Sequence, residues 1–188
     1  TAGSPWIFET DRLKCTAEFV IDATGGANPL GIPQDNSNIR TNSRAIYSHF
    51  TGVIPWGDLH GKTEHPYPCH EAALHHIFDG GWMYVLHFDN DITSAGFVLD
   101  NHKRPNDTWE SLMNEHPAIK EQFQHATPTM PLICTGRMQR RASRMVGDNW
   151  AMLPHSAYFL DPLHSAGIAH TLCGIEQLMP ILKKSEAG

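Results

Sequence analysis

The sequence contains no long apolar run and little basic charge. None of its 188 residues lies in an uninterrupted apolar stretch of the length that a bilayer-spanning helix needs, which is about 18 residues. Lys and Arg number 14 against 20 Asp and Glu, so the formal net charge is −6. Binding to nucleic acid or to an anionic membrane depends on a basic surface, which this balance does not provide. We therefore expect neither nucleic acid nor a membrane as a partner.

Cysteine is scarce and scattered. The chain has four, at Cys15, Cys69, Cys134 and Cys173. None belongs to a C-x-x-C pair of the zinc-ribbon type, and isolated cysteines fit a reducing compartment, so we expect a cytoplasmic protein. The first residues lack the basic and apolar regions of a secretory signal. They also lack an initiator Met, and their pattern is typical of a strand from the first residues on. We therefore expect that the chain is a piece of a longer protein.

The residues that are present predict an α+β fold. Apolar residues make up 40% of the chain and charged residues 18%, a composition that supports a packed core. Periodicity and turn residues predict a mostly antiparallel sheet, a helical excursion and a long C-terminal helix entered through a Gly turn. No linker is evident, so we expect one domain over 1–188. The expected segments are a strand from Leu13 to the Gly25-Gly26 turn, strands at 43–52, 72–78, 82–88 and 92–99, helices over 106–126 that restart at Pro117, extended structure over 132–154, and a helix from Ser165.

The final helix carries a regular apolar pattern. Its members, spaced as a core-facing stripe, are Ile168, Ala169, Leu172, Ile175, Met179 and Leu182. Pro180 is expected to end or kink the helix.

Thirteen histidines raise the question of a metal site. Two ligands on one helical face need a spacing of four, with a Glu directly after the first, whereas His70-Glu71 is followed by His75. The segment also reads as a strand, on which His75 and His76 face opposite sides. We expect no metal.

The stretch "DPLHSAGIAHTL" (161–172) suggests a docking site for a polar, electron-rich group. The first amides of a helix lack internal acceptors and lie at its positive end, and the small residues Ser165, Ala166 and Gly167 leave that backbone accessible. A capped core helix behind a tight turn, with Ser165 as N-cap, explains the same spacing equally well. A nucleophilic Ser165 is a weaker alternative, because "HSAGI" is not G-x-S-x-G.

Three segments resemble the flavin-halogenase and aromatic-hydroxylase superfamily of FAD-dependent oxidoreductases. "FVIDATGG" (19–26) is similar to its D-A-[ST]-G turn, "HHIFDGGWMYVLHFDNDITSAG" (75–96) to its central hairpins, and 149–178 to its C-terminal flavin motif. They occur in the family's order and cover most of the chain. The resemblance implies a substrate-binding sheet joined to a remnant of an FAD/NAD(P)-binding fold.

The resemblance also implies roles for individual residues. Asp22 to Gly25 would lie near the dinucleotide part of FAD, Asp161 and Pro162 beside the isoalloxazine, and His155 at the ribityl contact. The turn at Ser165, Ala166, Gly167 and Ile168 would face the pyrimidine end of the flavin ring, and in halogenases its amides, here those of Ala166 and Gly167, also hold chloride. Reduced flavin would react with oxygen above this turn, and the substrate would lie over the sheet. The residues of the expected substrate pocket are His75, Trp82 and Tyr84.

The sequence departs from the family in three places. The G-x-G-x-x-G element that holds the pyrophosphate is missing, so this chain alone is expected to bind FAD weakly or not at all, and the halogenase catalytic Lys would lie in the same missing part. Where the family usually has a Gly-Asp pair ahead of the flavin turn, this sequence has Pro154-His155. Where halogenases have the signature W-x-W-x-I-P, this sequence has Trp82-Met83-Tyr84-Val85-Leu86-His87. The last change favours hydroxylation or reduction over halogenation.

The resulting hypothesis is an FAD-dependent oxidoreductase, halogenase- or monooxygenase-like, that acts on a small, aromatic organic substrate. A flavin reductase or NAD(P)H would supply its electrons. The catalytic residues are not identified. A non-enzymatic sheet scaffold and a serine hydrolase that uses Ser165 remain the alternatives.

Overall fold

The computed structural model describes residues 4–61 and 66–186, which form two compact units. Unit 1 contains the chain up to Thr41 and again from Gln139, and unit 2 contains Asn42–Met138. Each unit has a hydrophobic core of its own. That 1–188 forms a single-domain fragment stays a prediction.

Unit 2 is built on an antiparallel sheet with the strand order β5-β6-β7-β4-β8, in which β9 also pairs with β4. The three expected strands between 72 and 99 are present as β5 to β7, and the expected α+β class is confirmed. The strands are β4 (Ser43–Thr51), β5 (Leu74–Phe78), β6 (Gly81–His87), β7 (Thr93–Asp100), β8 (Thr127–Pro128) and β9 (Ile133–Cys134). The helices of this unit are α1 (Trp56–His60), the short 3-10 helix η2 (Cys69–Glu71), α2 (Trp109–Glu115) and α3 (Pro117–Gln122).

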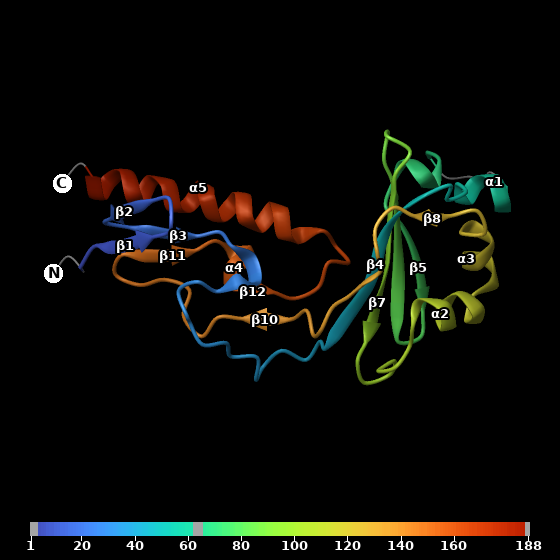
Figure 1. Cartoon of the computed structure of the whole chain (residues 1–188), viewed down its shortest axis with the longest axis horizontal. Coiled ribbons are helices and arrows are strands. Elements are labelled where there is room, and N and C mark those ends of the chain that lie inside the picture. The colour runs from blue at the N-terminus through green and yellow to red at the C-terminus, as the bar shows by residue number, and fades with distance from the viewer. Residues whose placement is uncertain (1–3, 62–65, 187–188) are drawn as a thin grey trace. The chain divides into compact units, whose positions relative to one another are not determined.

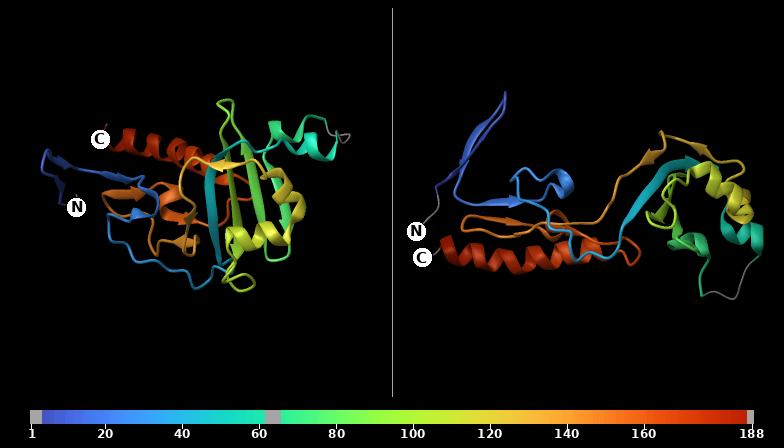
Figure 2. Two further views of the ribbon diagram at one scale, coloured as in Figure 1. Left: turned by 45° about the vertical axis from the view of Figure 1, so that its right-hand side comes forward. Right: turned by 90° about the horizontal axis from the view of Figure 1, so that it is seen from below.

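One face of this sheet is covered by α2 and α3 (Figure 2). Alternate residues of β4 point to that face, among them Ile46 and Phe50, as the expected alternation requires. Phe97 on β7 and Leu112 on α2 are fully buried in the same core. The opposite face carries the other set of side chains, which includes the three expected substrate residues.

The two helices begin where the sequence predicts. The Thr108 side chain accepts a hydrogen bond from the Ser111 amide, and the Ser111 hydroxyl accepts one from the Thr108 amide. This reciprocal capping box satisfies two amides that the first turn leaves unpaired. Pro117 occupies the first turn of α3, where a missing N–H costs nothing.

Unit 1 consists of short strand pairs and one long helix. Strand β11 pairs with β3 in parallel, while β1 with β2 and β10 with β12 are antiparallel. Trp150 and Met152 on β11 form the core with Ala142 and Ala157. The strands are β1 (Trp6–Glu9), β2 (Lys14–Ala17), β3 (Val20–Asp22), β10 (Arg140–Arg141), β11 (Trp150–Met152) and β12 (Tyr158–Phe159), and the helices are η1 (Gly25–Ala27), α4 (Pro154–Ala157) and α5 (Ala166–Glu186).

Helix α5, red in Figure 1, begins one residue after the expected start. It does not end at Pro180 but continues through it to Glu186, so this part of the expectation is wrong. Most of the apolar stripe is exposed, with Ile168 77% and Leu172 60% accessible, whereas Leu182 is half-buried. None of the described side chains of α5 is fully buried, and a Cβ on Gly174 would lie 2.7 Å from Cδ of Pro154 on α4. The least exposed residues of the helix are Ala166, Gly167, Thr171, Gly174, Leu178 and Leu182. No described helix is long and apolar enough to cross a membrane.

The attachment of β5 to α3 is expected to make unfolding pH-dependent. Nε2 of His76 donates to Oε1 of the fully buried Gln122 at 3.1 Å. Burial lowers the pKa of His76 below its ordinary 6.5, although the hydrogen bond with Gln122 opposes this shift. The neighbouring His116, His60 and His75 lower the pKa further.

Because His76 is harder to protonate in the folded state than in the unfolded state, its contribution to the free energy of unfolding is complete above its unfolded pKa. That contribution falls as the pH drops below this value. Urea unfolding from about pH 7 to about pH 5 should show a shallower loss of stability for His76→Gln than for the native protein. Equal slopes would contradict the assignment to His76.

Candidate cofactor site

The site begins at the carboxyl end of β3, where Asp22 is buried. Its Oδ1 accepts hydrogen bonds from the amide and the hydroxyl of Thr24, both at 2.8 Å. Its backbone oxygen accepts from the Leu153 amide at 2.9 Å, next to the parallel pairing of β3 with β11. The second carboxylate oxygen, Oδ2, is buried and has no partner among the described residues.

The turn after β3 is fastened to α4. The Gly25 amide donates to the hydroxyl of Ser156 at 2.9 Å, and Ser156 is itself buried. Gly25 has φ of 67°, a left-handed conformation that glycine adopts without the steric cost of a Cβ. The hydrogen bond therefore holds the D-A-T-G turn (22–25) against α4.

Helix α4 also contacts the start of α5. A Cβ on Gly167 would lie 2.9 Å from both Cε1 and Nδ1 of His155, so the imidazole packs directly against the backbone of the first helical turn. The His155 ring also lies 5.4 Å from the ring of Phe159. Glycine is thus required at 167, because the His155 ring lies too close to this backbone for a Cβ.

The segment before α5 is a pair of consecutive turns. Oδ1 of Asp161 accepts from the Leu163 amide, and the Pro162 oxygen accepts from the Ser165 amide, each at 2.9 Å. Ser165 has φ of 52° and is exposed. An N-cap normally has an extended backbone, so the left-handed Ser165 differs from the expected cap. The first amides of α5 lack intrahelical acceptors, and no hydrogen bond joins the Ser165 hydroxyl to a histidine in the described part of the chain.

Unit 1 therefore brings the expected cofactor residues into one connected structure. The contacts lead from Asp22 and Gly25 through α4 to His155 and then to Gly167. Asp161 and Pro162 shape the turn that leads into α5.

Sequence reasoning missed Ser156 and Arg140. The guanidinium of Arg140 lies along Gly25 and Gly26 and donates from Nη2 to the His155 oxygen at 2.7 Å. A signal existed in the sequence, because four of only 14 basic residues lie within 137–144.

The three expected substrate residues lie together in unit 2. His75 and Trp82 have ring centroids 5.0 Å apart, and Trp82 and Tyr84 have theirs 6.3 Å apart. Tyr84 lies across Gly96 of β7, where a Cβ would meet the phenol oxygen at 2.8 Å. Burial raises the pKa of Tyr84, although a hydrogen bond with Ser94 opposes this, so the phenol stays protonated at neutral pH. His75 also lines a hollow of about 220 Å³ with Tyr67 and Cys69.

The histidines of β5 are arranged as the strand alternation predicts. His75 contacts Trp82, whereas His76 faces Gln122 on α3. The described residues contain no group of three or more His, Cys, Asp or Glu side chains that could hold a metal ion.

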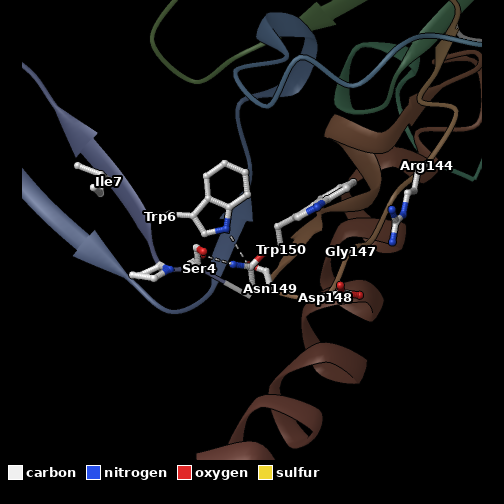
Figure 3. Close-up of a pocket in the computed structure, with 9 residues that line it drawn as sticks. Ser4, Trp6, Ile7, Arg144, Gly147, Asp148, Asn149 and Trp150 are labelled. Atoms are coloured by element: carbon white, nitrogen blue, oxygen red, sulfur yellow. Dashed lines mark hydrogen bonds between the residues drawn. The ribbon is translucent and has the colours of Figure 1, made fainter. Parts of the chain in front are cut away.

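A separate groove in unit 1, of about 490 Å³, contains none of the expected cofactor residues (Figure 3). Nε1 of Trp6 donates to the backbone oxygen of Asn149 at 3.1 Å. The side-chain amide of Asn149 donates to the backbone oxygen of Ser4 at 3.0 Å. The Arg144 guanidinium lies 6.0 Å from the Trp150 ring centroid. These contacts pack the β1–β2 hairpin against the 144–150 loop.

No family model matches the chain. Two curated relatives do: tetracycline 7-halogenase of Kitasatospora aureofaciens, 30% identical over 90% of this chain and 34% of that protein, and monodechloroaminopyrrolnitrin halogenase PrnC of Pseudomonas fluorescens, 30% identical over 92% and 33%. Among solved structures, halogenase PltM in complex with phloroglucinol and FAD superposes with a TM-score of 0.87 at 28% identity, over 97% of this chain and 42% of that one. PltM alone gives a TM-score of 0.87 at 29% identity, over 95% and 39%.

The chain is thus related in sequence and in fold to FAD-dependent halogenases, and the expected resemblance is confirmed. It spans about a third of the length of the curated relatives that it matches.

Loss of the Ser156 hydroxyl should destabilise the D-A-T-G turn. In Ser156→Ala the half-buried Gly25 amide loses its 2.9 Å acceptor, the hydroxyl of the buried Ser156. A hydrogen bond contributes about 0.5–1.5 kcal/mol net, so the free energy of unfolding should fall by that amount in chemical denaturation. Ser143→Ala, at an exposed serine nearby, is the matched control and should change little. Equal stabilities of the two variants would show that the bond does not hold the turn.

Proposed function

We propose that this chain forms part of an FAD-dependent oxidoreductase that halogenates a small aromatic substrate. The observation that carries the proposal is the connection of Asp22, Gly25, His155 and Gly167 through α4 in one unit. The similarity to PltM, a halogenase solved with FAD, supports the same reading.

The residues of unit 1 fit a flavin dinucleotide. The unpartnered Oδ2 of Asp22 is an acceptor suited to a sugar hydroxyl. The Ala166 and Gly167 amides open the first turn of α5, where partial positive charge favours an electron-rich ring edge or a halide. FAD, when bound, would supply the redox chemistry with oxygen, and the protein would orient the ring and stabilise its negative charge. Asp161, Pro162, Ser165 and Ile168 complete the proposed cradle.

The sheet face of unit 2 is the proposed substrate surface. His75, Trp82 and Tyr84 present an imidazole, an indole and a protonated phenol on one face. Aromatic side chains of this kind stack against a planar ring, and the phenol can donate a hydrogen bond to orient it. Electron-rich rings are the ones that an electrophilic halogen attacks.

The choice between halogenation and hydroxylation rests on the relatives. The altered W-x-W-x-I-P segment favours hydroxylation or reduction, but both curated relatives are named as halogenases. We therefore favour halogenation. The same proposal includes a flavin reductase or NAD(P)H as the source of electrons. It also includes a cytoplasmic location.

Flavin binding tests the proposal directly. The protein with its native flanking residues should acquire the visible absorption of bound flavin after incubation with FAD and gel filtration. Gly167→Leu should lose that absorption, because any side chain there meets the His155 ring. Ala169→Leu, two residues on at an exposed position of the same helix, is the control and should keep it. A native protein that stays colourless would contradict the proposal.

A further inference from the structure

Arg140 is a half-buried cation of unit 1 that forms no ion pair among the described residues. Its Nη2 donates to the His155 oxygen at 2.7 Å, and its guanidinium carbon lies 5.5 Å from the centroid of the Phe159 ring. No carboxylate pairs with it in the described part of the chain. The neighbouring Arg141, by contrast, forms a 2.6 Å ion pair with Asp35.

Part of this guanidinium is shielded from water and unused. Nε is buried and has no partner among the described residues. Burial lowers the pKa of Arg140, so the surroundings do not compensate for the charge. A guanidinium has five N–H donors in a rigid fork that fits oxygen anions.

On one side Arg140 lies along the backbone of two glycines, Gly25 and Gly26. The Nη2 atom is 3.9 Å from the position of a Cβ on Gly25, and the carbon and Nε are each 3.7 Å from that of a Cβ on Gly26. These are ordinary van der Waals distances, so the guanidinium lies directly beside the glycine backbone. Asn28, Gln34 and Ser156 line the small hollow beside them.

We infer that Arg140 recognises an anionic oxygen of the bound cofactor at the Gly25–Gly26 turn. The inference rests on the proposed flavin function and adds to it the residue that supplies the positive charge. Two parts of the cofactor carry such an oxygen: the diphosphate, and the flavin ring once it is reduced.

A purely structural role predicts something different. If Arg140 only tied β10 to the His155 backbone, its loss would loosen the whole site. Affinity for every flavin would then fall together, whether or not the ligand is charged. A role in charge recognition weakens only charged ligands.

The test compares Arg140→Gln and Arg140→Lys with the native protein, again with native flanking residues. Dissociation constants for FAD, ADP and neutral oxidised riboflavin are measured by fluorescence or calorimetry, and the midpoint potential of bound FAD by dye equilibration. Arg141→Gln, which removes the same charge one residue away, is the matched control. Thermal unfolding of each variant checks that it folds.

For Arg140→Gln we expect FAD to bind about tenfold or more weakly, while riboflavin affinity stays within about twofold. Arg140→Lys, which keeps the charge, should recover part of the loss. A parallel loss of ADP affinity assigns the oxygen to the diphosphate. An unchanged FAD affinity with a midpoint potential about 30 mV lower, which corresponds to a tenfold weaker hold on the two-electron reduced form, assigns it to the reduced ring.

Two results would overturn the inference: equal losses for FAD and riboflavin, or no change in any affinity or in the potential. Either leaves the proposed function standing as long as the native protein binds FAD. A native protein that binds no flavin defeats the proposed function itself, so the two failures can be told apart.

Discussion

The fastening of the D-A-T-G turn to α4 is the constraint on which the rest of unit 1 depends. The bond from the Gly25 amide to Ser156 ties the end of β3 to a four-residue helix. Such a helix has too few internal bonds to be stable alone, so its position is set by its neighbours. Because His155 precedes Ser156, the same bond places the imidazole against Gly167.

Polar groups without protein partners gather around this fastening. Asp22 Oδ2 and Arg140 Nε are both buried and unpaired among the described residues. Native folds rarely leave such groups unsatisfied, because each costs free energy. A carboxylate oxygen, a guanidinium and the free amides of a helix start together match the hydroxyls, anions and ring edge of a dinucleotide flavin. The proposed ligand would therefore satisfy atoms that the protein leaves open.

The sequence predicts unit 2 better than unit 1. Alternation and hairpin turns locate β5, β6 and β7, and capping residues locate α2 and α3, because these signals are local. They also place His75, Trp82 and Tyr84 on one face. The apolar period of α5 misleads in part, since Ile168 and Leu172 are exposed while Gly174 packs against Pro154. Periodicity reports which side chains share a face, but not whether that face is covered.

The missed residues show the same limit. Ser156 and Arg140 matter through contacts across 131 and more than 100 residues of sequence, and no short motif encodes such a contact. The resemblance of "FVIDATGG" and of 161–168 to a flavin motif names the two ends of the site. Only the fold shows that α4 joins them.

Amide hydrogen exchange of the protein with its native flanking residues, with and without FAD, tests the central claim most directly. The account predicts that FAD slows exchange in two separate stretches of unit 1, 22–27 and 161–168, while the β4 segment 43–51 changes little. Slower exchange elsewhere, with both stretches of unit 1 unaffected, would contradict it.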